Sequence, residues 1–155
     1  MRAVIQRVSR ASVRIDDEIV GSIGTGILVL LGAGSGDSVA TASRLATRVA
    51  ELRIFPDERG RMNRNLTQAG GGVLVVSQFT LYADASHGHR PSFLDAARPE
   101  LAVPLCATFI ETLRAAGLRV AEGRFGASMA VELVNDGPVT IVVSSGEPGW
   151  PSDAG

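Results

Sequence analysis

Gly26-Ile-Leu-Val-Leu-Leu-Gly-Ala33 is the longest apolar run in the 155-residue chain. Residues 26–31 have the length and the branched side chains of a buried strand, and the run is too short to cross a bilayer. Shorter strand patterns precede it, separated by turn residues such as Asp16-Asp17 and Gly24-Thr25. These earlier patterns cover residues 3–8, 11–15 and 18–23. The first third of the chain therefore predicts an antiparallel meander that ends on the apolar run.

Helical spacing replaces the strand pattern after the meander. A helix is expected over residues 38–53, where apolar residues recur every three or four positions and Asp37 or Ser38 can provide the N-cap. A second helix is expected over residues 99–117, with proline at its start and glycine at its end. Pro104 should kink this second helix or delay its start, because proline lacks the backbone N–H that a helix interior uses.

The remaining patterns complete a single domain. Further strands are expected at residues 73–76, 118–121, 129–134 and 139–143. Strands first, two helices between and strands last are typical of an α+β domain with a mainly antiparallel, curved, barrel-like sheet and two flanking helices. A chain of 155 residues with 45% hydrophobic content suits one such domain, which we place at residues 1–143. Residues 144–155, rich in Pro and Gly, are expected to form a loosely ordered tail.

Charge and cysteine content restrict the possible functions. The formal net charge is -1, so the molecule as a whole does not attract polyanions and any nucleic-acid contact must be local. All 15 basic residues are arginine, which genome base composition explains as readily as phosphate recognition. The sequence shows neither a membrane span nor a secretory signal, and its single cysteine cannot form an internal disulfide. A cytoplasmic protein is expected.

Residues that usually carry hydrolytic chemistry are missing or poorly placed. His87 and His89 are the only histidines, and no cysteine or spaced carboxylate accompanies them to bind zinc. Ser77 does not lie in a Gly-x-Ser-x-Gly elbow, and Cys106 lies in an apolar helical pattern that indicates packing. We therefore expect no metal and no cofactor.

Two polar segments border apolar strands and have a composition that strand formation does not require. They are Ser77-Gln-Phe-Thr-Leu81 and Asn135-Asp-Gly-Pro-Val-Thr140. In order and position they resemble the two signature motifs of the D-aminoacyl-tRNA deacylase family, Ser-Gln-x-x-Leu and Asn-x-Gly-Pro-x-Thr. Further similarity includes Arg90-Pro-Ser-Phe93 and Gly123-Arg-Phe-Gly-Ala127. The resemblance extends over about residues 1–143.

The resemblance implies a homodimer that hydrolyses the ester of D-aminoacyl-tRNA, and also of glycyl-tRNA mischarged on tRNA(Ala). It assigns catalysis to Ser77, Gln78, Phe79 and Thr80, with the backbone N–H groups around Phe79 and Thr80 as oxyanion donors. Ser77 and Gln78 would bind the terminal adenosine or the ester, and Phe79 would pack against that adenosine. An aminoacyl ester is already activated, so positioned water and oxyanion stabilisation suffice without a catalytic histidine.

Chiral selection is assigned by the resemblance to a second group of residues. Gly137-Pro138 would form a cis peptide whose main-chain carbonyls reach into the pocket of the partner subunit. These carbonyls would surround the α-carbon of the substrate, so that an L side chain collides while a D side chain or glycine is accepted. Arg7, Met129 and Asn135 complete the group, and Arg7 would hold the motif through hydrogen bonds to carbonyls.

Several of these residues also have a structural interpretation. Gly137-Pro138 fits an ordinary turn, Arg7 a charge at a strand edge, and Met129 plain core packing. The segment 77–81 fits a strand end in which Phe79 and Leu81 face the core. Thr80 could be a covalent nucleophile, but no adjacent base is apparent.

Four arginines near the loop before strand 73–76 have two interpretations. Arg53, Arg59, Arg61 and Arg64 could contact tRNA phosphates or simply be solvated. The competing functions are a related deacylase with a different chirality or substrate, a non-catalytic dimeric nucleic-acid-binding module, and a generic serine or metal hydrolase. The last lacks supporting residues, and the near-neutral charge argues mildly against the binding module.

Overall fold

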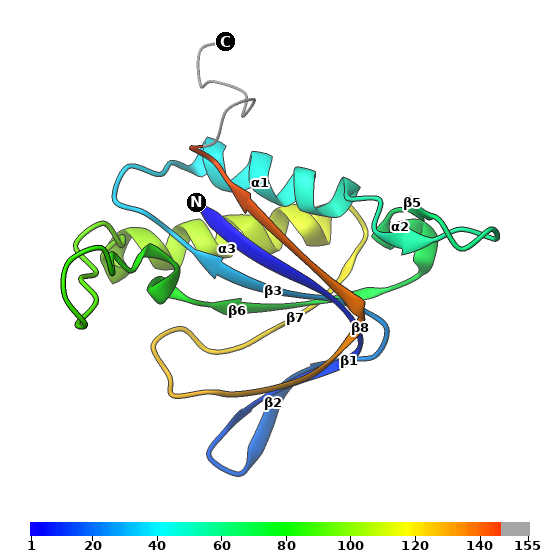
Figure 1. The fold of residues 1–155 in the computed structure, drawn as a ribbon, viewed down its shortest axis with the longest axis horizontal. Coiled ribbons are helices and arrows are strands. Elements are labelled where there is room, and N and C mark those ends of the chain that lie inside the picture. The colour runs from blue at the N-terminus through cyan, green and yellow to red at the C-terminus, as the bar shows by residue number, and fades with distance from the viewer. Residues whose placement is uncertain (147–155) are drawn as a thin grey trace.

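Residues 1–146 of the chain are described by the computed structural model. One six-stranded sheet has the order β2-β1-β3-β6-β7, and β8 pairs with β1 outside this path. The strands are β1 (Arg2–Ile15), β2 (Glu18–Ile23), β3 (Gly26–Gly32), β6 (Gly72–Ser77), β7 (Arg119–Glu122) and β8 (Ala130–Ser144). Two long helices, α1 (Val39–Glu51) and α3 (Pro99–Ala115), lie together on one side of the sheet (Figure 1). The prediction of a single α+β domain is confirmed.

The longest pairing in the sheet belongs to β1. Its first half pairs antiparallel with β3, its second half with β2, and β8 runs antiparallel along both halves. The predicted strands 3–8 and 11–15 are therefore one strand of 14 residues. Register shifts interrupt the β1–β8 ladder between Gln6 and Val8 and between Val8 and Arg10. Such irregularities bend a strand, which allows β1 to serve both halves of the curved sheet.

The predicted mainly antiparallel pairing is wrong for one side of the sheet. β3 and β6 are parallel, and so are β6 and β7, so the sheet is mixed. Each of these pairs is joined through a long helix, α1 in the first case and α3 in the second. Parallel neighbours need such a crossover connection, whereas the meander at the N-terminus needs only tight turns.

A third helix and a small hairpin occupy the region predicted as a loop between residues 56 and 72. β4 (Phe55–Pro56) pairs antiparallel with β5 (Met62–Arg64), and α2 (Leu66–Ala69) follows. A capping box starts α2: the Asn65 side chain accepts the Gln68 N–H, and the Gln68 side chain accepts the Asn65 N–H. The prediction of only two helices is corrected accordingly.

Both long helices begin close to their predicted starts. Ser38 is the N-cap of α1, and its hydroxyl accepts the Thr41 N–H at 3.2 Å. α3 begins at Pro99 and includes Pro104, so Pro104 does not delay its start. β8 ends at Ser144, and the predicted tail beyond residue 146 lies outside the described residues.

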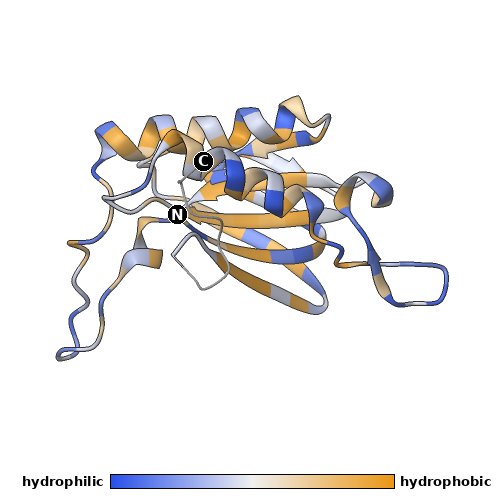
Figure 2. Cartoon of the chain, turned by 90° about the horizontal axis from the view of Figure 1, so that it is seen from above, coloured by the Kyte–Doolittle hydropathy of each residue, from blue (hydrophilic) through white to orange (hydrophobic). Residues whose placement is uncertain are grey.

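Two apolar clusters lie on the two faces of the sheet. The larger one joins α1 and α3 to β1, β3 and β6, and Phe109 is its largest fully buried side chain. Apolar residues run along the strands beneath these helices (Figure 2). The smaller cluster, which includes Val8, Leu28 and Leu74, fills the concave face. Within residues 1–146, no helix combines the length and apolar character that a membrane span requires.

The sheet is curved so strongly that β2 approaches β7. A Cβ atom placed on Gly21 in β2 would lie only 2.7 Å from the carbonyl oxygen of Glu122 in β7. Glycine is therefore required at this position, because any side chain would force the two strands apart. The nearly closed sheet agrees with the barrel-like curvature predicted from the sequence.

Truncation of Phe109 to alanine should lower the free energy of unfolding by about 3–5 kcal/mol, because it removes a fully buried ring from a packed core. Urea denaturation at one fixed protein concentration measures the change. Val39→Ala is the matched control: Val39 is exposed at the start of α1, and its loss should change stability by less than about 0.5 kcal/mol. Equal effects of the two substitutions would contradict the assigned core.

Candidate active site

The first signature segment lies where β6 ends. Ser77 is the last residue of β6, and the Gln78 N–H continues the sheet ladder by donating to the Leu31 carbonyl at 2.8 Å. The chain then turns into a 3-10 helix, η1 (Phe79–Tyr82). Ser77 and Gln78 are thus fixed by the sheet, and Phe79 and Thr80 by the short helix that follows.

Two residues far away in sequence, Arg2 and Asp37, hold η1 against the sheet. The Arg2 guanidinium donates to the Leu81 carbonyl at 2.8 Å and lies 4.4 Å from the centre of the Tyr82 ring. The Tyr82 hydroxyl donates to Asp37 at 3.1 Å. Burial and the neighbouring Asp37 carboxylate raise the pKa of Tyr82 above its usual range, so this hydroxyl keeps its proton and its hydrogen bond. The sequence analysis did not identify Arg2, Asp37 or Tyr82 as positioning residues.

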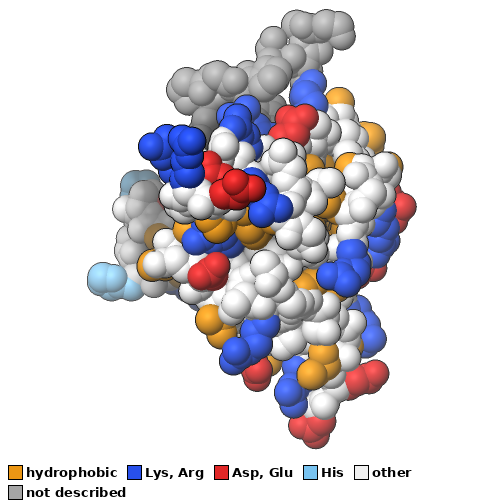
Figure 3. Space-filling model, turned by 90° about the vertical axis from the view of Figure 1, so that its right-hand side faces the viewer, with side chains coloured by type: hydrophobic (Ala, Val, Ile, Leu, Met, Phe, Trp, Pro, Cys, Tyr) orange, Lys and Arg blue, Asp and Glu red, His pale blue; other side chains and the backbone are white. Residues whose placement is uncertain are grey.

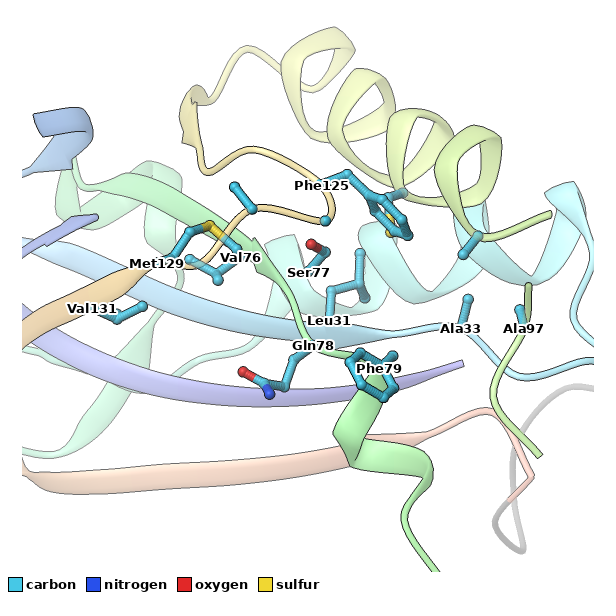
Figure 4. Close-up of a pocket in the computed structure, with 14 residues that line it drawn as sticks. Leu31, Ala33, Val76, Ser77, Gln78, Phe79, Ala97, Phe125, Met129 and Val131 are labelled. Atoms are coloured by element: carbon cyan, nitrogen blue, oxygen red, sulfur yellow. The ribbon is translucent and has the colours of Figure 1, made fainter. Parts of the chain in front are cut away.

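A pocket of about 260 Å³ opens beside this strand end. Four of the predicted site residues line it: Ser77, Gln78, Phe79 and Met129. The other lining residues are Leu31, Ala33, Val76, Ala97, Ala102, Cys106, Phe125, Gly126, Ala127 and Val131. The rings of Phe125 and Phe79 lie on opposite sides of the hollow, and Leu31 and Ser77 lie between them (Figure 4). The pocket is therefore mostly apolar, with a hydroxyl and an amide at one wall.

Phe79 faces solvent and not the core. Its side chain is 56% exposed, and its ring meets the Phe93 ring edge-on with centroids 5.1 Å apart. The interpretation of segment 77–81 as a strand end with Phe79 packed inside is therefore wrong. An exposed aromatic pair at a pocket mouth is suited to stacking against a planar ligand.

Thr80 is not among the residues that line the pocket. Its hydroxyl accepts a hydrogen bond from the Gln78 side-chain amide. The Thr80 hydroxyl thus bonds the side chain of a residue that lines the pocket.

A second group forms around the Asn135–Thr140 segment. This segment is continuous with β8, although two separate strands were expected, and the Gly137-Pro138 peptide is cis. The Asn135 side chain spans the segment: it accepts the Val139 N–H at 2.9 Å and donates to the Thr140 hydroxyl at 3.1 Å. These bonds hold the main chain on both sides of Gly137-Pro138.

Arg7 ties this segment to the rest of the fold. Its Nε donates to the Asp136 carbonyl at 3.0 Å, and its Nη1 donates to the Ile54 carbonyl at 2.6 Å. The Asp136 carboxylate lies 3.5 Å from the same guanidinium. The Arg7 side chain is only 12% exposed, so these are shielded, charge-assisted contacts and not those of a free strand-edge charge.

The two groups do not meet within the chain. Across the sheet, Arg7 in β1 lies opposite Ile27 in β3, which in turn lies opposite Val73 in β6. Ser77 in β6 lies opposite Leu31, four residues further along β3 than Ile27. The second group therefore lies about four residues, or ~13 Å, further along the sheet, with β1 and β3 also between them. Of the predicted site residues, Met129 joins the pocket, while Arg7, Asn135, Gly137 and Pro138 lie elsewhere.

Metal chemistry has no cluster of ligands to support it in the described part of the chain. Among residues 1–146, no group of three His, Cys, Asp or Glu side chains is placed to hold a metal ion.

The pocket walls contain residues that the sequence analysis named for other reasons or not at all. Phe125, Gly126 and Ala127 belong to a stretch noted for similarity but given no role. Ala33 and Ala97 carried no signal, because an alanine beside a pocket has the same pattern as an alanine in a core.

Comparison with known proteins places both segments within one family. The model of the D-Tyr-tRNA(Tyr) deacylase family matches residues 4–144. The chain belongs to this family.

Curated relatives support the assignment over nearly the whole length. The D-aminoacyl-tRNA deacylase of Roseiflexus sp. (strain RS-1) is 62% identical over 145 residues, which cover 94% of each chain. That of Thermomicrobium roseum is 60% identical over 147 residues, covering 95% of this chain and 96% of the relative. The prediction of a deacylase, a hydrolase that acts on the ester of aminoacyl-tRNA, is confirmed.

One solved structure carries a different name. The c-Myc DNA Unwinding Element Binding Protein superposes with a TM-score of 0.88 at 39% identity, covering 94% of this chain and 99% of its own.

The thiol in the pocket wall of this deacylase should be unreactive near neutral pH. Burial raises the pKa of Cys106 to about 11, and only the thiolate is a good nucleophile. At pH 8, iodoacetamide should modify native protein about a hundredfold more slowly than urea-unfolded protein, and the native rate should climb toward pH 11. Mass spectrometry of timed samples gives both rates. Equal rates at pH 8 would show that burial does not suppress the ionisation of Cys106.

Proposed function

We propose that this chain hydrolyses the ester bond of D-aminoacyl-tRNA and releases the free amino acid and the tRNA. The observation that carries the proposal is the pocket at the end of β6, where Ser77, Gln78 and the exposed ring of Phe79 meet. Family membership gives the reaction class, and the pocket gives a place for the reacting end of the substrate. The reaction belongs in the cytoplasm, where tRNA is aminoacylated and used.

The pocket suits the terminal aminoacyl-adenosine and not the body of a tRNA. Its volume of about 260 Å³ is close to the lower end of sites for small ligands. Phe79, paired with Phe93, offers an aromatic surface at the pocket mouth on which the adenine can stack. Ser77 and Gln78 supply hydrogen bonds to the ribose or the ester.

Hydrolysis at this site requires a positioned water molecule and hydrogen-bond donors for the oxyanion, because the aminoacyl ester is already activated. Phe79 and Thr80 form the first turn of η1, where backbone N–H groups have no partner inside the helix. These two N–H groups stabilise the oxyanion that forms when water attacks the ester carbonyl. The ribose oxygen then leaves and takes up a proton. Thr80 orients the Gln78 amide, and no covalent intermediate on Thr80 is required.

Chiral selection comes from a second copy of the chain. Gly137 and Pro138 lie too far from the pocket of their own protomer, so we infer a homodimer in which their carbonyls enter the pocket of the partner. Arg7 and Asn135 hold these carbonyls in place. An L side chain would collide with the main chain there, whereas a D side chain would point outward and glycine would have nothing to collide. Glycyl-tRNA mischarged on tRNA(Ala) is therefore a second substrate.

Purified protein should release amino acid rapidly from D-Tyr-tRNA and Gly-tRNA but not from L-Tyr-tRNA. A chelator should leave the rates unchanged, because no step uses a metal. Thr80→Ala should retain activity within about tenfold, since it removes only an orienting hydrogen bond and leaves the main-chain donors. Quantifying free amino acid over time gives all of these rates. Complete loss of activity in Thr80→Ala, with the fold intact, would favour Thr80 as a nucleophile.

Gly137→Ala should lower kcat/KM on D-Tyr-tRNA by roughly a hundredfold, because a shift of about 1 Å in the main chain that surrounds the α-carbon of the substrate is costly in catalysis. Gly137 has φ of 136°, and an added Cβ would lie 2.8 Å from the Val139 side chain and 3.0 Å from the Arg7 guanidinium. Gly36→Ala is the matched control, since an added Cβ there meets nothing within 4 Å. Comparable activity in both variants would remove Gly137 from the site.

A binding module is the second candidate, favoured by the solved structure that is named for DNA binding. It predicts that tRNA is bound while every aminoacyl ester stays intact. Gel-shift and hydrolysis assays on the same preparation separate it from the deacylase.

A further inference from the structure

The β4–β5 hairpin carries arginines that the proposed reaction does not use. Residues 58–64 of this hairpin are all exposed, and the face of the molecule on which it projects shows several arginine side chains among a few acidic ones (Figure 3). An arginine whose guanidinium already has partners on the protein is less available to a ligand than one that has none.

Of the four arginines in and beside the hairpin, Arg53 and Arg64 form hydrogen bonds to residues of the hairpin and of α2. Arg53 donates through Nε to the Asn63 carbonyl at 2.7 Å, and also to the Asn63 side chain. Arg64 donates to the Gln68 carbonyl at the end of α2. Within residues 1–146, the guanidinium groups of Arg59 and Arg61 make no hydrogen bond or ion pair with the protein, and both lie at the turn. Only these two are available as phosphate ligands among the hairpin's arginines.

Hydrogen bonds to Asp57 fix the main chain of the turn that carries Arg59 and Arg61. The Asp57 carboxylate accepts the Arg59 and Arg61 N–H groups at 2.9 and 3.0 Å, and it also accepts the Asn63 amide at 3.3 Å. Hydrogen bonds from the backbone, that of Arg61 first, lower the pKa of Asp57. This carboxylate is directed at the turn's own main chain, so Glu58 is the one remaining acidic side chain between Asp57 and Arg64.

The base of the hairpin shares an anchor with the Gly137-Pro138 segment. One guanidinium, that of Arg7, donates to the carbonyl of Ile54 immediately before β4 and to the carbonyl of Asp136 immediately before Gly137. Arg59 lies five residues beyond Ile54, which is at most about 17 Å of extended chain. Wherever Gly137 and Pro138 are placed, the hairpin is therefore placed beside them.

We propose that Arg59 and Arg61 bind backbone phosphates of the tRNA whose ester is cleaved in the partner's pocket. This inference rests on the proposed function, because it uses the homodimer in which Gly137 and Pro138 enter that pocket. Each tRNA is then held by two protomers: one receives its terminal adenosine, and the other supplies both the chiral filter and the phosphate contacts. Arginine suits this role, since its planar group pairs with two phosphate oxygens at once.

The test compares two esters of one amino acid, D-Tyr-tRNA and D-tyrosyl-adenosine, which lacks the tRNA phosphates. Arg59→Ala/Arg61→Ala should lower kcat/KM on D-Tyr-tRNA by roughly tenfold and make its dependence on log salt concentration shallower by about one to two. Cleavage of D-tyrosyl-adenosine should change by less than about twofold. Arg59→Lys/Arg61→Lys, which keeps both charges, should retain most of the tRNA activity, and Glu58→Gln should raise it.

The outcomes are distinguishable. Equal loss on both esters in the alanine variant would mean that the arginines support the fold of the site, and no loss on either ester would mean that they bind nothing; both results overturn this inference. Failure of the unsubstituted protein to cleave either ester would overturn the proposed function, and this inference with it.

Placement in the partner is tested with heterodimers purified through two different tags. In the first, one protomer carries Arg59→Ala/Arg61→Ala and the other carries Ser77→Phe, which fills its pocket. In the second, one protomer carries all three substitutions and the other none. Our proposal requires high activity on D-Tyr-tRNA in the first heterodimer and low activity in the second. The reverse order would show that the hairpin serves the pocket of its own protomer.

Discussion

The pairing of β1 with three other strands is the constraint on which the rest of the structure depends. β1 holds β3 and β2 along one edge and β8 along the other. It also supplies Arg2, which fixes η1 beside the pocket, and Arg7, which fixes the Gly137-Pro138 segment. Because both arginines belong to one strand, the two halves of the site are set at a fixed spacing. A strand with irregular register can do this while it bends around the core.

Most polar groups of the site orient main chain and do not supply proton transfer. Asn135 bridges the ends of its own segment, Gln78 and Thr80 bond each other, and Arg7 binds carbonyls. Cys106, which lines the pocket, and Tyr82 in η1 both have raised pKa values and stay neutral near pH 7. Such an arrangement suits an activated ester, for which a rigid set of N–H donors and a shaped pocket provide enough stabilisation of the transition state.

The sequence predicted the elements with regular patterns and missed what depends on tertiary contacts. Helical spacing and Ser38 located α1, and the first signature segment begins where the strand pattern of residues 73–76 ends, whereas the second lies inside one continuous strand and not between two. Parallel pairing of β3 with β6 was missed because the strand pattern of residues 73–76 is the same in either direction, although the helix predicted at residues 38–53 is the kind of crossover connection that parallel strands need. The capping box of α2 was present in the sequence at Asn65 and Gln68, but a four-residue helix has too few positions to show periodicity.

Among the site residues too, the sequence revealed those in local motifs and missed those that depend on tertiary contacts. A local motif selected Ser77, Gln78 and Phe79, which line the pocket together because they are consecutive in the chain. The anchors Arg2 and Asp37 were missed, since their partners, Leu81 and Tyr82, lie far away in sequence and an isolated charge carries no pattern. The separation of the two signature segments was likewise invisible before the register of β1, β3 and β6 was known.

Arg7 joins the segment proposed for chiral selection to the hairpin proposed for phosphate binding. Its guanidinium has one short bond to the hairpin base and one to the Gly137-Pro138 segment, and its side chain is largely shielded from water. Loss of either carbonyl would leave a buried charge partly unsatisfied, which is costly, so the two segments hold each other in place. In the proposed dimer, the protomer that inspects the chirality of the amino acid is therefore also the one that holds the tRNA.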